Sequence, residues 1–297
     1  MKGIPLDKPS IDKKGIAAFL GITFIITYAI EGALILSGIS PLVKGWGQYV
    51  IVAVMWVPAL ATLLTVKCVT HEGFGLTNMR FGGWRPYVAV GLIIPGCFIL
   101  IYGLTWTLGL GQPDWTLEHF KGLFATAGME VPSIPPPQLI WPLLIAASLL
   151  VGPFINSVFA FGEELGWRGY LLPKLLPAGK VRAYVFLGII WGLWHLPLVL
   201  VGFMYPGAPF SGALMFTMLT TVLGIYINEM TLRYRSSILA GWIHGVFNTQ
   251  RLGVWALLFP NVHPWLGGFS GMLGIGVWLL LGLWAGRRSL RRFAQAA

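Results

Sequence analysis

Charged residues are scarce in this chain of 297 amino acids, in which Asp, Glu, Lys and Arg together make up 10%. Hydrophobic residues make up 56%, and the mean hydropathy is +0.77. Soluble globular domains carry about 25% charged residues, so the composition excludes that class and indicates an integral membrane protein.

Cysteine is nearly absent as well, since the chain contains only Cys68 and Cys97. Their positions match no metal-ligand spacing, and a disulfide cannot be inferred from sequence alone. We expect two buried structural thiols. A small-residue cleavage site is also missing after the first apolar run, which is too long for a signal-peptide core, so we expect that run to be retained as a helix.

Apolar runs of about 20 residues, the length that spans a hydrocarbon core, recur eight times along the chain. They lie at roughly 16–37, 48–66, 87–109, 140–162, 183–203, 210–228, 237–258 and 270–286. Their lengths and their lack of period-2 alternation argue against an outer-membrane barrel. The sequence therefore predicts an all-α polytopic membrane protein, a single integral membrane domain over residues 1–297, with about eight transmembrane helices enclosing a cytoplasm-facing cavity.

The formal net charge of +10 is explained by membrane topology. Lys and Arg gather at both termini and in alternate connections, whereas only Lys44 and Lys121 fall on the opposite side. The positive-inside rule then places both termini in the cytoplasm, and we expect the protein in the cell (plasma) membrane. The basic residues are expected to contact anionic lipid headgroups, not nucleic acid.

Polar residues inside the apolar runs cluster in the C-terminal half, and we expect the helices over 140–258 to carry the catalytic core. An ionisable group in hydrocarbon costs about 2.5 kcal/mol or more, so such groups normally face a bundle interior or a wet cavity. They form three short motifs: Glu163-Glu164-x-x-x-Arg168, Trp191-x-x-x-His195 and His244-x-x-x-Asn248.

The first motif gives its two glutamates different surroundings. Neighbouring residues on a helix point about 100° apart, so Glu163 and Glu164 cannot serve one point. Glu164 and Arg168, at i and i+4, are spaced to pair. Glu163 then has no local cation, and a carboxylate in a partly dry site suits a general base. The alternative is that all three are interfacial charges at a helix end.

The other two motifs supply hydrogen-bonding groups at a similar depth. Pro197 is expected to kink the helix beside His195 and to free a backbone carbonyl. His244 and Asn248, on one helix face, can donate to a developing oxyanion. Interhelical polar packing is the alternative for these residues. At 1.5 Å per residue they lie, with Glu163, roughly 10–18 Å inside the cytoplasmic surface, which is the pattern of a hydrolytic centre.

In order and spacing, the three motifs resemble the signature of the CAAX protease and bacteriocin-processing family (CPBP, or Abi), which includes the eukaryotic type II CAAX prenyl endopeptidase. The surrounding words GEELGWRGYLLP, GLWHLPL and RSSILAGWIHGVFN also resemble it, and the resemblance covers about residues 155–250. One departure is Trp191, where the family usually has Phe. We expect altered packing there, not lost chemistry.

This resemblance implies an intramembrane, glutamate-dependent endopeptidase. Its substrate would be cut near a hydrophobic or lipidated (CAAX-type) C-terminus. The roles that the resemblance implies are activation of a water by Glu163 and His195, stabilisation of the oxyanion by His244 and Asn248, and support of the site by Glu164 and Arg168.

The expected mechanism uses no cofactor. Two histidines and a glutamate could form a catalytic zinc set. However, the chain contains no H-E-x-x-H, and no carboxylate is left to act as base beyond Glu164, which Arg168 is expected to occupy. We therefore expect a directly activated water, without metal and without a covalent acyl-enzyme.

Four other charged residues in or beside the runs are expected to be structural. Glu229 and Arg233, at i and i+4, are spaced for an interfacial ion pair. Glu31 and Arg251 lie deeper, where structural pairing is the default and lining of a substrate path is the alternative.

Two other functions fit part of the sequence. One is a non-proteolytic membrane partner, in self-immunity or regulation, that keeps the same residues without turnover. The other is a small transporter, which the lack of a repeat pairing the first four helices with the last four disfavours. For the favoured endopeptidase, the expected partners are membrane lipids and a hydrophobic or prenylated peptide.

Overall fold

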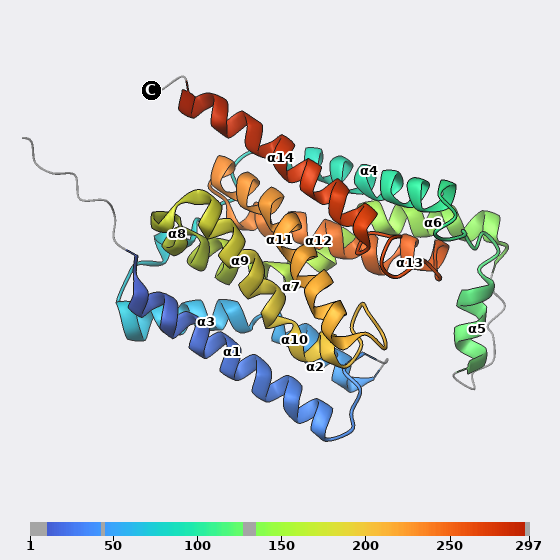
Figure 1. Cartoon of the computed structure of the whole chain (residues 1–297), viewed down its shortest axis with the longest axis horizontal. Coiled ribbons are helices and arrows are strands. Elements are labelled where there is room, and N and C mark those ends of the chain that lie inside the picture. Colours follow the sequence, from blue (N-terminus) through green and yellow to red (C-terminus); the bar gives the residue numbers. More distant parts are fainter. Residues whose placement is uncertain (1–10, 43–44, 127–134, 295–297) are drawn as a thin grey trace, which may run out of the picture.

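The computed structural model describes residues 11–42, 45–126 and 135–294, and in these ranges the chain forms helices without a strand (Figure 1). In chain order the α-helices are α1 (Lys13–Leu36), α2 (Trp46–Val54), α3 (Val57–Thr65), α4 (Arg85–Thr107), α5 (Glu118–Thr126), α6 (Pro137–Leu150), α7 (Gly152–Glu164), α8 (Leu172–Leu175), α9 (Lys180–Trp194), α10 (Leu196–Leu200), α11 (Pro209–Tyr234), α12 (Ser237–Leu252), α13 (Val254–Leu258) and α14 (Met272–Ala294). Two π-helical segments, η1 (Val66–Thr70) and η3 (Leu165–Leu171), and two short 3₁₀ turns, η2 (Phe74–Thr77) and η4 (Leu176–Ala178), complete the set.

The predicted all-α, polytopic membrane fold is confirmed, but the count of eight spanning helices is not. All eight expected segments are mainly helical. Among the described residues, five helical stretches have the length and composition to cross a membrane: Lys13–Leu36, Trp46–Thr70, Arg85–Thr107, Pro137–Ala178 and Pro209–Tyr234. A sixth stretch, Met272–Arg287, is apolar but shorter.

Proline accounts for most of the breaks that divide the expected helices. Pro58, Pro153 and Pro197 each stand in the first turn of the helix that follows a break, namely α3, α7 and α10. Proline lacks an N–H and tolerates this position, whereas inside a helix it removes a hydrogen bond and clashes with the preceding turn. The fourth break follows Gly253, between α12 and α13. Hydropathy alone does not detect such breaks.

Closely packed glycines hold together the helices that carry the three motifs. The α7–α12 pair makes the most extensive contact between two helices, and a Cβ on Gly245 would come within 2.2 Å of the Ser157 hydroxyl. A Cβ on Gly188 would likewise lie 2.5 Å from the Thr221 backbone, where α9 meets α11. Small residues let helix backbones approach closely in a membrane, where hydrophobic burial does not drive association.

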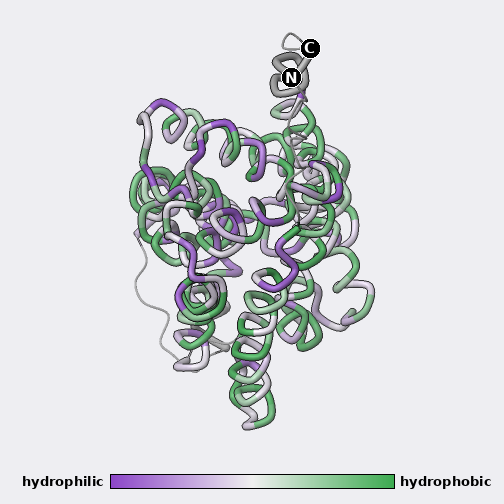
Figure 2. Tube along the Cα trace, turned by 90° about the vertical axis from the view of Figure 1, so that its left-hand side faces the viewer, coloured by the Kyte–Doolittle hydropathy of each residue, from purple (hydrophilic) through white to green (hydrophobic). Residues whose placement is uncertain are grey.

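The surface of the described chain is apolar and its polar groups are largely internal. Figure 2 shows long hydrophobic (green) helices, with hydrophilic (purple) stretches that are short by comparison. Large apolar side chains such as Ile25, Leu92 and Phe210 are exposed, at 71%, 70% and 84%. By contrast, the buried groups include Glu31, Glu163, Glu164, Arg168 and Glu229. This inversion is expected where lipid, not water, surrounds the helices.

Two smaller expectations are wrong in whole or in part. The expected ion pair of Glu229 with Arg233 is wrong, because Glu229 pairs with Lys180 at 2.5 Å and Arg233 donates to a backbone carbonyl of α14. Both cysteines are free, but Cys68 is exposed and Cys97 is only partly buried, so burial was wrongly expected at Cys68 and is incomplete at Cys97. The connection between α4 and α6 contains the short helix α5, on which Glu118 is exposed.

Candidate active site

The two adjacent glutamates stand where the helix geometry changes. Glu163 and Glu164 are the last residues of α7, and the π-helical segment η3 begins at Leu165. A π-helical turn is rare and frequently occurs at functional sites. Both carboxylates are almost fully buried, at 2% and 0% exposure.

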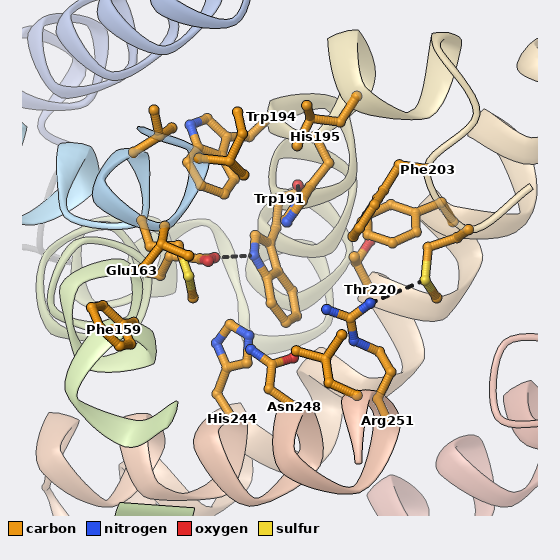
Figure 3. Close-up of a pocket in the computed structure, with 18 of the residues that line it drawn as sticks. Phe159, Glu163, Trp191, Trp194, His195, Phe203, Thr220, His244, Asn248 and Arg251 are labelled. Atoms are coloured by element: carbon orange, nitrogen blue, oxygen red, sulfur yellow. Dashed lines mark hydrogen bonds between the residues drawn. The ribbon is translucent and has the colours of Figure 1, made fainter. Parts of the chain in front are cut away.

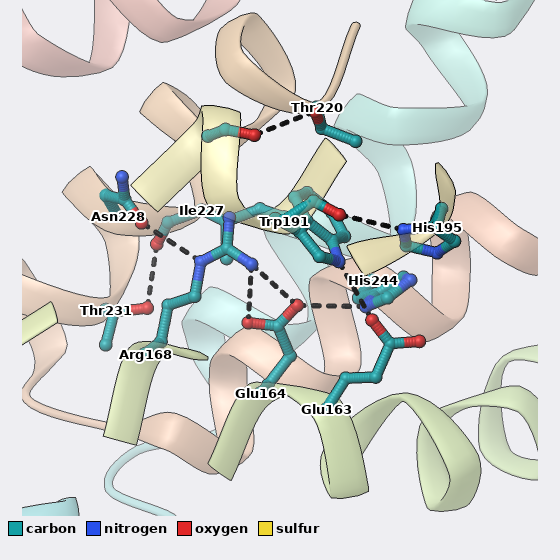
Figure 4. A network of polar contacts seen from close by, with 11 residues as sticks. Glu163, Glu164, Arg168, Trp191, His195, Thr220, Ile227, Asn228, Thr231 and His244 are labelled. Carbon is teal, nitrogen blue, oxygen red and sulfur yellow. Dashed lines mark hydrogen bonds and ion pairs between the residues drawn. The ribbon is translucent and has the colours of Figure 1, made fainter. Parts of the chain in front are cut away.

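Glu164 is the centre of a buried polar network, drawn in Figure 4. The predicted pair with Arg168 forms, with Nη1 lying 3.0 Å from both carboxylate oxygens. On its other side, Glu164 Oε1 lies 2.9 Å from Nδ1 of His244 on α12. Arg168 also donates from Nε to Asn228 of α11 at 3.0 Å, and its guanidinium lies 4.4 Å from the Trp191 ring. The network therefore joins α7, η3, α9, α11 and α12 around one carboxylate.

Glu163 has a different neighbour. Its Oε2 accepts a hydrogen bond from the indole Nε1–H of Trp191 at 2.9 Å. Within the described ranges, no Lys, Arg or His lies within ion-pair distance of Glu163. The Glu164 carboxylate is thus paired with Arg168 and His244, whereas the Glu163 carboxylate is held by the neutral indole of Trp191.

His195 stands at the break between α9 and α10, and the break determines its tautomer. Its backbone N–H donates to Gly192, which leaves the Trp191 carbonyl to the His195 ring at 2.9 Å from Nδ1. A carbonyl only accepts, so Nδ1 carries the proton and Nε2 keeps a free lone pair. Pro197 frees the Leu193 carbonyl, as predicted, and the Tyr28 hydroxyl of α1 donates to it at 2.5 Å.

His244 and Asn248 project from one face of α12. Since Glu164 accepts the proton on Nδ1 of His244, the opposite nitrogen, Nε2, is the one left for other contacts. The His244 ring is also held by an edge contact with Trp191, with ring centroids 5.3 Å apart. Asn248, one turn further along α12, is 8% exposed.

The structure brings all four residues expected to act on substrate to one cavity of about 410 Å³, shown in Figure 3. Glu163 comes from α7, His195 from the α9–α10 break, and His244 and Asn248 from α12. Glu164 and Arg168 lie behind this wall and do not line the cavity. Most of the remaining lining is apolar, and it comes from α2, α7, α9, α10, α11, α12 and the connecting loops.

Two contacts of the site were not predicted from the motifs. Trp191 is a hydrogen-bond donor to Glu163, and not only a packing residue. Glu164 orients His244 in addition to pairing with Arg168. The sequence does contain one overlooked signal, because each motif overlaps a small-xxx-small spacing typical of close helix pairs: Gly162/Gly166, Gly188/Gly192 and Gly241/Gly245.

Glu31 and Arg251 also line the cavity, so structural pairing was wrongly expected for both. Neither forms an ion pair with another described residue. Glu31 is 1% exposed, and its Oε2 has no hydrogen-bond partner in the described part of the chain. The alternative raised for these two, a place along the path of a substrate, fits their positions.

The described residues contain no group of three or more His, Cys, Asp or Glu side chains close enough to hold one metal ion. The two histidines of the site are turned differently, since Nδ1 of His195 contacts a carbonyl and Nδ1 of His244 contacts Glu164.

Comparison with known proteins adds to this geometry. Residues 138–250 match the family model described as type II CAAX prenyl endopeptidase Rce1-like, and the matched segment contains all three motifs. This part of the chain is similar to the Rce1-like family. CAAX prenyl protease 2 from Methanococcus maripaludis is 26% identical over 241 residues, which cover 77% of this chain and 81% of that protein.

These similarities confirm the family resemblance and support a CAAX-type endopeptidase, which is a hydrolase. The Rce1-like segment begins in α6 and ends in α12. It therefore includes the α7, α9 and α12 side chains that face the cavity, whereas Glu31 and Arg251 lie outside it.

Proposed function

We propose that this protein is a glutamate-dependent intramembrane endopeptidase that hydrolyses a peptide bond by direct activation of water. The observation that supports it most strongly is the division of the two glutamates. Glu164 is fully engaged by Arg168 and His244, whereas Glu163 faces the cavity with one neutral donor on one oxygen. A general base must keep a carboxylate oxygen free for a proton, and of these two glutamates only Glu163 does so.

In the proposed reaction, Glu163 accepts a proton from a water as that water attacks the carbonyl carbon of the substrate. His195 holds the water, because its free Nε2 accepts the second hydrogen. Glu163 then returns its proton to the amide nitrogen as the C–N bond breaks. No protein atom bonds covalently to the substrate in this scheme.

The negative oxygen that forms on the attacked carbonyl is assigned to α12. In its protonated form, His244 donates from Nδ1 to Glu164 and has a second N–H at Nε2 for the oxyanion. The side-chain amide of Asn248 supplies another donor from the same helix face. Arg168 and Glu164 act indirectly, since they fix the orientation of the His244 ring.

The substrate that suits this cavity is a peptide whose hydrophobic or lipidated end lies in the bilayer. Apolar side chains such as Ile51, Met55 and Phe159 line the cavity beside the polar residues. We place the protein in the cell membrane with both termini cytoplasmic, because Lys and Arg gather on that side of the predicted topology. Its other partners are then membrane lipids, and we assign it no nucleic-acid ligand.

A cleavage assay with the purified protein tests the proposal. Farnesylated and unlipidated fluorogenic peptides with free C-termini are incubated with wild type, with Glu163→Gln and with the control Glu118→Gln, whose side chain is 70% exposed on α5. Wild type and the control should cleave alike, and Glu163→Gln should lose at least about 100-fold in kcat, the contribution expected of a general base. Full activity in Glu163→Gln refutes the assignment.

The same assay tests metal dependence. We propose that the reaction uses no metal, so 1,10-phenanthroline and EDTA should leave the rate unchanged. Loss of activity that added zinc restores would contradict this part of the proposal, and would assign the histidines and Glu163 to metal binding.

A further inference from the structure

Arg251 is a cation that lines the cavity and has no anionic partner among the described residues. It lies on α12, lines the cavity, and forms no ion pair with any described carboxylate. Its hydrogen bond within the described chain runs from Nη1 to the thioether of Met204 at 3.3 Å. A thioether is a weak acceptor, and a guanidinium carries five N–H donors.

Arg168 shows how this protein satisfies a buried guanidinium that has only a structural task. Its Nη1 reaches both oxygens of Glu164 and its Nε donates to the side-chain oxygen of Asn228, so an anion lies directly beside it although its buried Nη2 has no partner in the described part of the chain. Arg251 has no comparable partners, although both arginines lie in apolar surroundings where an uncompensated charge is costly. The contrast indicates that the anion for Arg251 arrives from outside the chain.

Neighbouring groups fix the direction of Arg251. Its guanidinium carbon lies 5.4 Å from the centre of the Phe203 ring, which in turn stacks near His195 with ring centroids 6.4 Å apart. Figure 3 shows the guanidinium turned into the cavity, toward Thr220 and Phe203. A planar guanidinium held by an aromatic face and a thioether presents its remaining N–H groups as a fork, the geometry that matches a carboxylate.

Arg251 also stands in register with the groups assigned to the oxyanion. His244, Asn248 and Arg251 are spaced i, i+4 and i+7, which puts all three on one face of α12. Along the helix axis Arg251 is about 10 Å beyond His244, at 1.5 Å per residue. An extended peptide rises about 3.3 Å per residue, so about three residues cover this distance.

We infer that Arg251 binds the C-terminal carboxylate of the substrate and so sets the distance between the scissile bond and the end of the chain. This inference rests on the proposed endopeptidase activity and adds the feature by which a C-terminal peptide is told from an internal one. A peptide that ends in a neutral amide, or continues past this point, leaves Arg251 without its anion.

The test compares two peptides of identical sequence, one ending in a free carboxylate and one in a carboxamide. A charge-assisted hydrogen bond contributes about 1.5–3 kcal/mol, so wild type should favour the acid by about 10- to 100-fold in kcat/KM. Arg251→Met should reduce this preference to about one, chiefly by slower cleavage of the acid. Arg251→Lys, which keeps the charge but not the fork, should retain part of it.

The matched control is Arg182→Met, an exposed arginine at the start of α9, which should keep the full preference. If wild type cleaves both peptides equally, or if Arg251→Met keeps the preference for the acid, the inference is wrong while the proposed function stands. If wild type cleaves neither peptide, the proposed function and this inference fail together. If Arg251→Met does not fold, Arg251→Lys tests the inference in its place. A ratio of kcat/KM for the acid to that for the amide equal to the wild-type ratio would then refute binding of the carboxylate by the paired N–H groups of Arg251.

Discussion

Trp191 offers the sharpest test of how Glu163 is held. Its indole N–H donates to Glu163 Oε2 at 2.9 Å, while its ring contacts His244 and lies under the Arg168 guanidinium. Trp191→Phe keeps an aromatic ring between His244 and Arg168 and removes the N–H donor to Glu163. Phe keeps an aromatic ring at this position, so the variant should fold.

The expected size of the effect follows from the type of hydrogen bond that is lost. A hydrogen bond to a charged group contributes about 1.5–3 kcal/mol, and Trp191→Phe removes the one that reaches the Glu163 carboxylate at 2.9 Å. If this bond fixes the base for proton transfer, Trp191→Phe lowers kcat by about 10- to 100-fold. KM should change little, because the indole N–H is directed at Glu163 and away from bound substrate.

The assay is steady-state cleavage of the acid peptide, with separate determination of kcat and KM. Trp278→Phe is the control, because that indole is also fully buried and donates to a backbone carbonyl at 3.0 Å, but belongs to α14. Both variants should lose similar stability in thermal unfolding, and only Trp191→Phe should lose kcat. Equal kcat values for Trp191→Phe and wild type would refute the positioning role and return Trp191 to simple packing.

Three further predictions concern stability, each measured by thermal unfolding in detergent. Glu164→Gln should destabilise the protein by about 3–5 kcal/mol, because it leaves a buried guanidinium uncompensated, and unchanged unfolding would contradict the network. Gly245→Ala should lower the melting temperature because it prevents close packing of α7 on α12, whereas Gly276→Ala, where a Cβ would have nothing within 4 Å, should leave the melting temperature nearly unchanged. Equal losses of melting temperature in the two variants would contradict the packing. Lys174 lowers the pKa of Asp12 by hydrogen bonding to it. Asp12→Asn should therefore lower the free energy of unfolding by up to about 1 kcal/mol at pH 7. Because the pKa is lowered in the folded state, this difference between variant and wild type should disappear as the pH falls well below 3.8, and a difference that persisted there would contradict the pairing.

What the sequence predicted well were features that depend on neighbours along the chain. Glu164 and Arg168 are one helical turn apart, and their pair forms even though η3 is π-helical. Pro197 breaks its helix and frees the carbonyl four residues before it. Both follow from local geometry, which the order of residues determines directly.

Contacts between helices could not be predicted in the same way. His244 and Glu164 are 80 positions apart, and Trp191 and Glu163 are 28 apart, so their meeting depends on how α7, α9 and α12 pack. The same limit explains the error at Glu229, whose i+4 neighbour is less favourable a partner than Lys180 on another helix. Helix spacing shows which pairs are possible, and only packing decides which of them form.

The cavity contains opposite charges that do not neutralise each other. Glu163 and Arg251 both line it, yet no ion pair joins them, and Figure 3 shows Trp191 and Asn248 between the two. Direct pairing would occupy the proposed base and also fill the proposed carboxylate site. Their separation leaves each charge available for a ligand. A bound peptide then contacts both, with its scissile carbonyl near Glu163 and its terminal carboxylate on Arg251. The same separation that prevents Glu163 and Arg251 from pairing therefore sets the distance between the scissile bond and the C-terminus of the substrate.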